Sequence, residues 1–266
     1  MCIRDSSIHS STPRSKNRSR SPADRHADSV SVAPAGIRAL LTRGIAELQD
    51  ERTNSYCIRL PLLLPSTLLD TWKEALLGLN WTRPNNAGGF PIPRQTIWVA
   101  NCQCKYEYGG MKIEPQPFDK LLTEIITLVF EKLNMPLPNS CNLNLYTHGT
   151  QQVGWHDDAE ALFESEDVRI ISLSLGATRN FEVVSKANLF KAKSRCRFAT
   201  KKADPADITT IQPNQGDVLV MAGKMQKYFE HRVPPDTSLK PRINLTWRYI
   251  TRHAQSCPKC HPELSD

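Results

Sequence analysis

Apolar residues recur at helical spacing in three segments of the first half of the chain. Side chains three or four positions apart predict helices over residues 37–48, 67–79 and 118–133. Thr67 and Asp70 have the spacing of a capping box, so the second helix is expected to begin at Thr67.

The second half of the chain consists of short β-prone runs, which turn residues such as Gly176 and Gly216 separate. The predicted strands are 142–146, 169–175, 181–184, 207–211, 217–221 and 243–250. Helices followed by a run of strands indicate an α+β fold, in which an antiparallel sandwich or jelly roll lies behind a layer of N-terminal helices.

The first part of the chain differs from the rest in composition. Residues 1–34 are rich in Ser, Arg and Pro, and they nearly lack the large apolar side chains that could offset the entropy of ordering. We therefore predict a disordered basic tail over 1–34, one domain over 35–253, and a Cys-containing tail over 254–266. A solvated segment, a nuclear-targeting segment and an organelle transit peptide remain alternatives for the first tail, and the nucleus is the predicted location.

Charge and cysteine content narrow the class of protein. A net charge of +7 with a pI near 9.0 favours a polyanionic partner. The eight cysteines do not form the dense framework of a small secreted domain, so we expect free thiols in a reducing compartment. No apolar run approaches the ~18–20 residues that span a membrane, and a soluble monomer is expected.

Two histidines and one aspartate suggest a metal site. His156 and Asp158 lie two residues apart, so both side chains of an extended segment point to the same face. With the distant His231 they would form a facial triad, the ligand set of non-haem Fe(II) oxygenases, which leaves positions open on the metal. Neither signal is specific alone, because such pairs arise by chance and an isolated histidine is more often a surface residue.

The predicted last strand alternates between polar and apolar residues. Arg242, Asn244, Thr246 and Arg248 share one face, while the residues between them are apolar. An ordinary half-exposed strand would show the same alternation. Two arginines beside an iron site would, however, suit the carboxylates of 2-oxoglutarate, because the guanidinium binds carboxylate with two parallel hydrogen bonds.

Two further segments carry chemistry of their own. Cys257 and Cys260 are half of a zinc pattern, and Cys102 with Cys104 could complete it; free thiols are the alternative. The segment 186–202 holds seven cations and no acid, and we expect a long hairpin that contacts a phosphate backbone, or else a solvated loop. Its cations are Lys186, Lys191, Lys193, Arg195, Arg197, Lys201 and Lys202.

With these residues in place, the chain from Pro93 to Tyr249 resembles the AlkB-type dioxygenases, which oxidatively dealkylate nucleic-acid bases. The resemblance is strongest in NLYTHGTQQVGWHDDAE (144–160), SLSLGATRNFEV, GDVLVMAGKMQKYFEHRVP and PRINLTWRYI. The Asn-x-Tyr-x-x-Gly segment, the His-x-Asp pair, the distal His and Arg-x-Asn-x-Thr-x-Arg occur in the order of the family.

The resemblance implies a double-stranded β-helix core and a role for each matching residue. Iron would be held by His156, Asp158 and His231. The co-substrate 2-oxoglutarate would be bound by Asn144, Tyr146, Arg242, Asn244 and Arg248, with Arg242 on the distal carboxylate. The substrate would meet Arg94 at the start of the nucleotide-recognition lid, Tyr106, Tyr108 and Glu160. Tyr108 is the ring expected to stack on a flipped base, although both tyrosines could be plain strand packing.

The activity that the resemblance implies is Fe(II)- and 2-oxoglutarate-dependent demethylation of N-alkylated bases in DNA or RNA, a direct reversal of alkylation damage. An N-methyl group of 1-methyladenine or 3-methylcytosine would be hydroxylated and lost as formaldehyde, after the base had left its stack. A 2-oxoglutarate hydroxylase acting on protein and a catalytically silent nucleic-acid-binding module are the alternatives.

The sequence departs from the family at two places that bear on the substrate. Ala159 stands where many DNA-acting members carry a second acid, and residues 81–90 show no clear match to the apolar finger that fills the gap left by a flipped base. Phe90 could serve, although a mobile Gly-rich loop is the alternative. Both departures argue against duplex DNA as the substrate.

Overall fold

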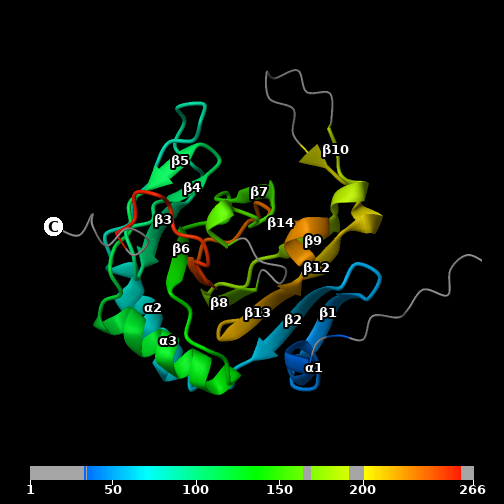
Figure 1. Ribbon diagram of the computed structural model, residues 1–266, viewed down its shortest axis with the longest axis horizontal. Helices are drawn as coiled ribbons and strands as arrows, with labels where there is room; N and C mark the ends of the chain where they lie inside the picture. Colours follow the sequence, from blue (N-terminus) through cyan, green and yellow to red (C-terminus); the bar gives the residue numbers. More distant parts are fainter. Residues whose placement is uncertain (1–32, 34, 164–168, 192–200, 259–266) are drawn as a thin grey trace, which may run out of the picture. The chain divides into compact units, whose positions relative to one another are not determined.

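Two antiparallel sheets carry most of the polar residues singled out above (Figure 1). The computed structural model describes residues 33, 35–163, 169–191 and 201–258, all within the compact unit Ser31–Asp266. The predicted first tail, 1–34, lies outside the described residues except for Ala33.

The larger sheet has seven strands and the smaller sheet has four. In spatial order the larger sheet consists of β1 (Ile45–Asp50), β2 (Ser55–Pro61), β13 (Asp217–Gly223), β8 (Ile170–Gly176), β15 (Arg242–Arg248), β6 (Ser140–Tyr146) and β3 (Gln95–Ala100). The smaller sheet consists of β12 (Thr209–Ile211), β9 (Phe181–Ser185), β14 (Phe229–Val233) and β7 (Val153–His156). Two short hairpins, β4 (Tyr106–Tyr108) with β5 (Met111–Ile113) and β10 (Phe190–Lys191) with β11 (Lys201–Lys202), complete the described strands.

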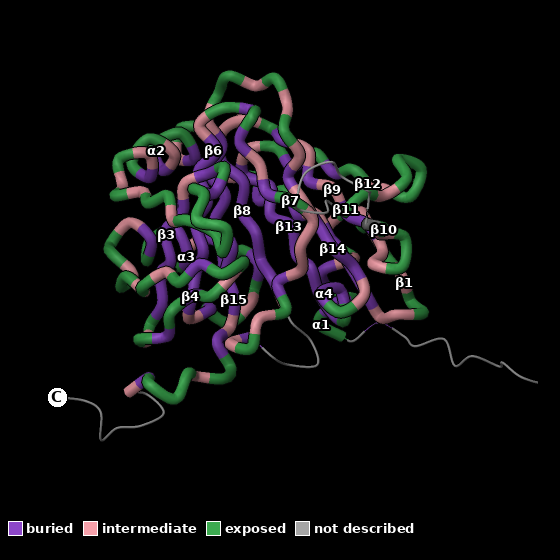
Figure 2. The backbone as a smooth tube through the Cα atoms, turned by 90° about the horizontal axis from the view of Figure 1, so that it is seen from above, coloured by how far each residue is buried: buried purple, intermediate pink, exposed green. Residues whose placement is uncertain are grey.

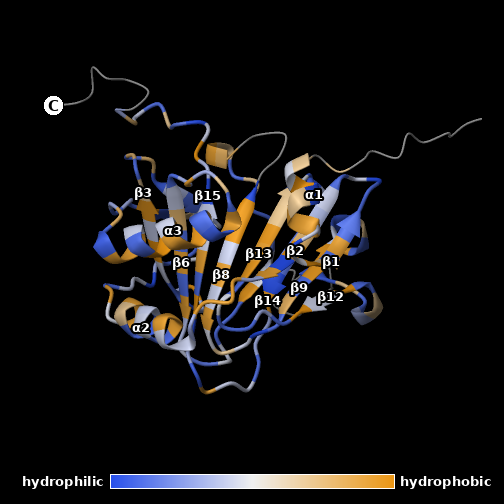
Figure 3. Cartoon of the chain, turned by 90° about the horizontal axis from the view of Figure 1, so that it is seen from below, coloured by the Kyte–Doolittle hydropathy of each residue, from blue (hydrophilic) through white to orange (hydrophobic). Residues whose placement is uncertain are grey.

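The central strands of the larger sheet are buried on both faces because each face has its own core. On one face, alternate residues of β8, β13 and β15 pack with the helices α1 (Ala35–Leu41), α2 (Ser66–Leu77) and α3 (Lys120–Leu133). On the other face, Leu219 and Met221 pack with Phe181, Val183 and Phe229 of the smaller sheet. Figure 2 shows the central strands β8 and β13 as buried, and Figure 3 shows apolar residues along the same strands. The antiparallel sheets fit the predicted α+β jelly roll.

Helix α3 follows its predicted range closely. It begins at Lys120 rather than residue 118, because Asp119 is the N-cap and accepts a hydrogen bond from the Leu122 amide at 2.7 Å. It ends at Leu133, as predicted, where Asn134 adopts a left-handed conformation with a φ of 54°.

The other two predicted helices need correction. The first ends at Leu41, and residues 45–48 belong to β1, where pairing with β2 outweighs their helical spacing. The predicted capping box does not form: the N-cap of α2 is Pro65, and Asp70 instead binds Lys73 at 3.0 Å and Gln215 at 3.1 Å.

The predicted strands all exist, with ends that differ by at most two residues, and several strands were not predicted. Residues 207–211, for example, shorten to β12 because Pro205–Asp207 form a 3-10 turn. Strands β1, β2, β3, β7 and β14 were missed. The pairing of β10 with β11 confirms the hairpin at the ends of the basic segment, whereas residues 192–200 lie outside the described part. Among the described helices, none has the length and apolar character needed to cross a membrane.

Gly176 ends β8 opposite Arg242, and its conformation requires glycine. Its φ is 85°, and an added Cβ would overlap the carbonyl oxygen of Pro241. Gly89 has nearly the same φ, 79°, but nothing lies within 4 Å of an added Cβ. These two glycines therefore separate the cost of a left-handed backbone from the cost of a close approach.

We expect Gly89→Ala to lower the free energy of unfolding by about 1 kcal/mol, the cost of the left-handed conformation alone. Gly176→Ala should lower it by about 3 kcal/mol, because the overlap with Pro241 adds to that cost. Urea denaturation of both variants measures the difference, and equal losses would show that the close approach at Gly176 relaxes without cost.

Candidate active site

Three side chains that could bind one metal ion meet where β7 and β14 pair. His156 ends β7, Asp158 follows two residues later, and His231 lies directly opposite His156 on β14. The Nε2 of His156 lies 3.8 Å from Oδ1 of Asp158, and the Nε2 of His231 lies 3.8 Å from Oδ2 of the same carboxylate. Two atoms that are each about 2.1 Å from one ion cannot be more than about 4.2 Å apart, so each histidine lies within the range at which it could share an ion with this carboxylate. The structure thus brings together the predicted facial triad.

Hydrogen bonds orient two of these ligands. The Nδ1 of His156 lies 2.8 Å from the carbonyl oxygen of Gly154, which can only accept, so Nδ1 carries the proton and Nε2 is free for a metal. The backbone amide of Asp158 donates to Oε1 of Gln226 at 2.9 Å. Sequence reasoning missed Gln226, which lies in the short helix α4 (Met225–Tyr228) and has no motif of its own.

The electrostatics of the three ligands favour a bound cation. Burial lowers the pKa of His156, and burial together with the neighbouring His156 lowers the pKa of His231 to about 3, so both imidazoles are neutral at physiological pH. Burial alone would raise the pKa of Asp158. The Arg248 guanidinium, by its charge and its hydrogen bond, is the main group that opposes this effect, and the pKa of Asp158 lies well below its usual range. The site therefore presents two neutral nitrogens and one carboxylate, as Fe(II) requires.

Arg248 connects β15 to the metal ligands. Its Nη2 lies 2.6 Å from Oδ2 of Asp158, and the side chains of both residues are almost fully buried. The guanidinium also lies over the rings of Tyr106, at 5.6 Å, and Phe163, at 5.3 Å. Its Nε and Nη1 are buried without a hydrogen-bond partner among the described residues, so two donors remain for an acceptor.

Arg242 lies at the other end of the same face of β15. Its Nη2 donates to Oγ of Ser174 at 2.9 Å, while Nε and Nη1 have no partner within the described part of the chain. Burial lowers the pKa of Arg242 to about 10, an unfavourable environment for a cation. Tyr146 lies beneath the guanidinium, 5.6 Å from its ring centroid. A carboxylate at this position would satisfy both free donors, which is the requirement that 2-oxoglutarate meets.

The remaining residues predicted to bind 2-oxoglutarate belong to a hydrogen-bonded layer around the same cavity. Asn244 donates to Ser172 Oγ at 2.6 Å and accepts from Thr246 at 2.7 Å. Asn144 accepts from Nε of Arg94 at 2.7 Å. The cavity joins the metal triad to both arginines and is lined by Tyr146, His156, Asp158, Ser172, His231, Arg242, Asn244 and Arg248, among others.

Arg94 was predicted at the start of the substrate lid, but it is buried. Its exposed fraction is 6%, and its guanidinium lies 5.9 Å from the ring centroid of Tyr108 while it binds Asn144. Arg94 therefore connects the cavity to the aromatic residues of the β4–β5 hairpin rather than extending into solvent.

The two tyrosines of β4 occupy different environments. Tyr106 is buried and stacks on Trp98, with ring centroids 4.8 Å apart. Tyr108 is half-buried, parallel to Tyr106, and contacts the ring of the metal-site residue His156 edge-on at 5.4 Å. Tyr106 therefore packs within the hydrophobic cluster, which is the alternative considered for both tyrosines. Tyr108 instead reaches the metal site.

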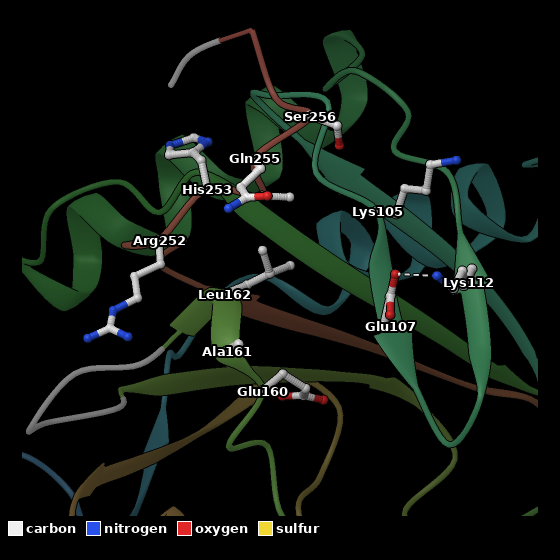
Figure 4. A pocket seen from close by; sticks show the side chains of 11 residues that line it. Lys105, Glu107, Lys112, Glu160, Ala161, Leu162, Arg252, His253, Gln255 and Ser256 are labelled. Atoms are coloured by element: carbon white, nitrogen blue, oxygen red, sulfur yellow. Dashed lines mark ion pairs between the residues drawn. The ribbon is translucent and has the colours of Figure 1, made fainter. Parts of the chain in front are cut away.

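Glu160 lines a pocket of about 590 Å³ (Figure 4). Its Oε1 accepts from the hydroxyl of Tyr106 at 2.8 Å, and its Oε2 is buried without a partner among the described residues. Burial and the nearby Asp158 raise the pKa of Glu160 to about 7. In Figure 4, Lys112 lines the pocket on the hairpin side and Arg252 lines the opposite side.

Two lysines of the basic segment 186–202 form ion pairs with acids of the same chain. Lys186 forms an ion pair with Asp157 at 2.6 Å, and Lys201 forms one with Glu230. Three of the seven cations lie in 192–200, outside the described residues, and Lys202 is exposed. A role in phosphate binding therefore stays a prediction for this segment.

Comparison with known proteins places the chain in a family. The family model for the 2OG-Fe(II) oxygenase superfamily matches residues 57–248. A mouse protein named alpha-ketoglutarate-dependent dioxygenase alkB homolog 3 is 30% identical over 234 residues, which cover 86% of this chain and 72% of the mouse protein. The chain therefore belongs to the AlkB-type 2OG-Fe(II) oxygenases.

Two further relatives support this placement. The Arabidopsis thaliana protein named DNA oxidative demethylase ALKBH2 is 28% identical over 183 residues, covering 64% of this chain and 58% of that protein. A solved structure described as "The structure of OsALKBH1" has a TM-score of 0.50 at 18% identity and covers 73% of this chain and 96% of that one. At that identity the structure supports the fold alone.

Arg242 and Arg179 form a matched pair for a stability test. Both exposed fractions are 2%, and both guanidinium groups lie 5.6 Å from the Tyr146 ring centroid. Arg179, which sequence reasoning missed, donates to the carbonyl oxygens of Gly149, Gln151 and Pro234 and forms an ion pair with Asp236 at 2.6 Å.

We expect Arg179→Met to lower the free energy of unfolding of the metal-free protein by about 3–5 kcal/mol, because it leaves buried acceptors and an acid without their partner. Arg242→Met should leave it unchanged or raise it, because a buried cation without an acidic partner is removed. Urea denaturation of both variants gives the comparison. A loss at Arg242→Met as large as that at Arg179→Met would contradict this account of Arg242.

Proposed function

We propose that this protein demethylates N-alkylated bases of the 1-methyladenine and 3-methylcytosine type in DNA or RNA, in a reaction that requires Fe(II) and 2-oxoglutarate. The observation that carries the proposal is the pairing of an aromatic ring and a buried acid beside the metal ligands: Tyr108 contacts His156 edge-on, and Glu160 is bonded to Tyr106, whose ring is parallel to that of Tyr108. A flipped base needs an aromatic face to stack on and a polar group to recognise its edge, and these two residues supply both.

The electrostatics around Tyr108 and Glu160 favour a cationic base. Bases methylated at N1 of adenine or N3 of cytosine carry a delocalised positive charge. A cation beside Glu160 would favour the ionised carboxylate, whose Oε2 has no partner among the described residues. A protein-hydroxylating enzyme would share the iron site but has no need for this pairing of a ring with a buried acid.

The residues of the cavity have separate roles in the proposed reaction. His156, Asp158 and His231 would hold iron, which together with 2-oxoglutarate and O₂ supplies the oxidising power to hydroxylate an N-methyl carbon. Arg242 would bind the distal carboxylate of 2-oxoglutarate, beside Tyr146. Arg248 would hold Asp158 ionised and offer its free donors to the co-substrate.

The chain's own residues would then position the methylated base. Tyr108 stacks on it, and its edge-on contact with His156 sets the distance between the base and the metal ligands. Arg94 holds the wall behind Tyr108 by joining it to Asn144. The hydroxylated methyl group leaves as formaldehyde and the base is restored, while flanking nucleotides would occupy the pocket beside Glu160.

The first test is turnover of the purified protein with Fe(II), ascorbate and 2-oxoglutarate on oligonucleotides that contain 1-methyladenine or 3-methylcytosine. The panel holds single-stranded DNA, duplex DNA and RNA, and mass spectrometry reads the loss of one methyl group. We expect demethylation that His156→Ala abolishes. Succinate release without any demethylation would contradict the proposal and favour a protein substrate.

Tyr108 gives a sharper test of base recognition. We expect Tyr108→Ala to reduce kcat/KM for the methylated oligonucleotide about 5- to 150-fold, since stacking of one base is worth ~1–3 kcal/mol. Tyr108→Phe should retain most of the activity, because the ring is kept.

The control for this test is Tyr228→Ala, which removes a half-buried ring of α4 that packs against another cluster. Release of succinate in the absence of nucleic acid should be equal in all three variants, because none of them alters a residue of the metal triad. A loss at Tyr108→Ala no greater than at Tyr228→Ala would remove Tyr108 from the base site.

A further inference from the structure

A second group of potential metal ligands lies outside the iron site. Cys102, Cys104, His253 and Cys257 place three sulfurs and one ring nitrogen within 4.8 Å of one another. Cys102 and Cys104 follow β3, whereas His253 and Cys257 follow β15. The group therefore combines two pairs of residues that are far apart in the sequence. The predicted zinc pattern used Cys260, which lies outside the described residues. His253 was not foreseen because only the fold brings it to the cysteines.

The distances in this group match tetrahedral zinc. The Nδ1 of His253 lies 3.6 Å from the sulfur of Cys104 and 3.4 Å from that of Cys257. With Zn–S near 2.3 Å and Zn–N near 2.0–2.1 Å, tetrahedral geometry sets the sulfur–nitrogen separation at about 3.6 Å. None of the three cysteines is in a disulfide.

The surroundings hold the ligands in place. The indole nitrogen of Trp98 donates to the carbonyl oxygen of Cys104 at 2.9 Å, and the amide of Ala254 donates to the Cys104 sulfur at 3.4 Å. Such hydrogen bonds around a ligand are the usual support of a structural metal site. Cys104 and Cys257 are fully buried in the same cluster as Trp98 and Tyr106, whereas Cys102 and His253 are half-buried.

The segment that carries His253 and Cys257 has no helix or strand of its own. Within the described part, residues 249–258 form only bends and turns, attached by backbone bonds from Thr251 and Arg252 to the carbonyl oxygen of Leu162. Residues 252–256 of this segment line the pocket beside Glu160, opposite the hairpin residues Lys105 and Lys112 (Figure 4). A crosslink here would fix that wall of the pocket relative to the hairpin.

From these observations we propose that Cys102, Cys104, His253 and Cys257 bind one structural zinc ion, which joins the segment after β15 to the loop between β3 and β4. All four positions are filled by protein ligands, so the site is closed and takes no part in the oxidation. Its role is to hold the β4–β5 hairpin, with Tyr106 and Tyr108, against the end of the strand that carries Arg248.

The test measures zinc in the His156→Ala background, in which the iron triad cannot retain a metal and compete for the reading. Elemental analysis after dialysis should find about one zinc per chain in His156→Ala, as a closed four-ligand site retains its ion. The double variant His156→Ala/Cys257→Ala should lose it. His156→Ala/Cys57→Ala is the matched control, because Cys57 is equally buried but outside the group, and it should keep the zinc.

Two further measurements keep the test decisive if the Cys257 variant folds poorly. In His156→Ala itself, thiol alkylation should spare Cys102, Cys104 and Cys257 until zinc is removed. After zinc is removed, hydrogen exchange of residues 101–113 and 249–258 should become faster.

Substitutions of the histidine ligand add a separate test in the same background. The variant His253→Cys should retain zinc with four sulfurs, while His253→Ala should lose it. Absence of zinc from His156→Ala, or retention in the Cys257→Ala double variant, would overturn the proposal. Neither readout depends on the substrate of the iron site.

Discussion

Asp158 and Arg248 form an ion pair at 2.6 Å that is buried on both sides, and the site is organised around it. Replacing a buried ion pair by apolar residues is often neutral or stabilising, so stability is a weak reason for keeping one here. Its local effect is clear: Arg248 holds Asp158 ionised despite its burial, which a metal ligand requires. The same contact joins β15 of the larger sheet to the loop that follows β7 of the smaller sheet, and so aligns the two sheets across the cavity.

The larger sheet makes this arrangement possible by keeping its two faces apart. Apolar residues at alternate positions of β8, β13 and β15 pack with the helices, and β15 turns its polar residues toward the smaller sheet. Buried polar groups are costly unless they are bonded. Ser172, Asn244 and Thr246 meet that requirement among themselves, whereas Arg242 and Arg248 retain free donors. The donors that remain mark where a carboxylate co-substrate fits.

Sequence analysis predicted the parts of this structure that depend on local pattern. The alternation of residues 242–248 was enough to predict β15. The spacing of His156 and Asp158 was not specific alone, and the triad was predicted because His231 and the arginines follow in the order of the family that the chain resembles. Strand β1 was predicted as helix because its spacing is helical, and only pairing with β2 makes it a strand. Gln226, Arg179 and His253 were missed for another reason: each acts through partners distant in sequence, such as Asp158 or Cys104, and no local pattern records such contacts.

The most direct test of this account is an anaerobic titration of the Fe(II)-loaded protein with 2-oxoglutarate, followed by the visible charge-transfer absorption that forms when 2-oxoglutarate chelates iron. The account predicts a saturable band in the wild-type protein, no band in His231→Ala, and a band in Arg242→Met that requires at least about tenfold more 2-oxoglutarate, because charge-assisted hydrogen bonds are worth ~1.5–3 kcal/mol. A band of unchanged affinity in Arg242→Met, or one that survives in His231→Ala, would contradict it.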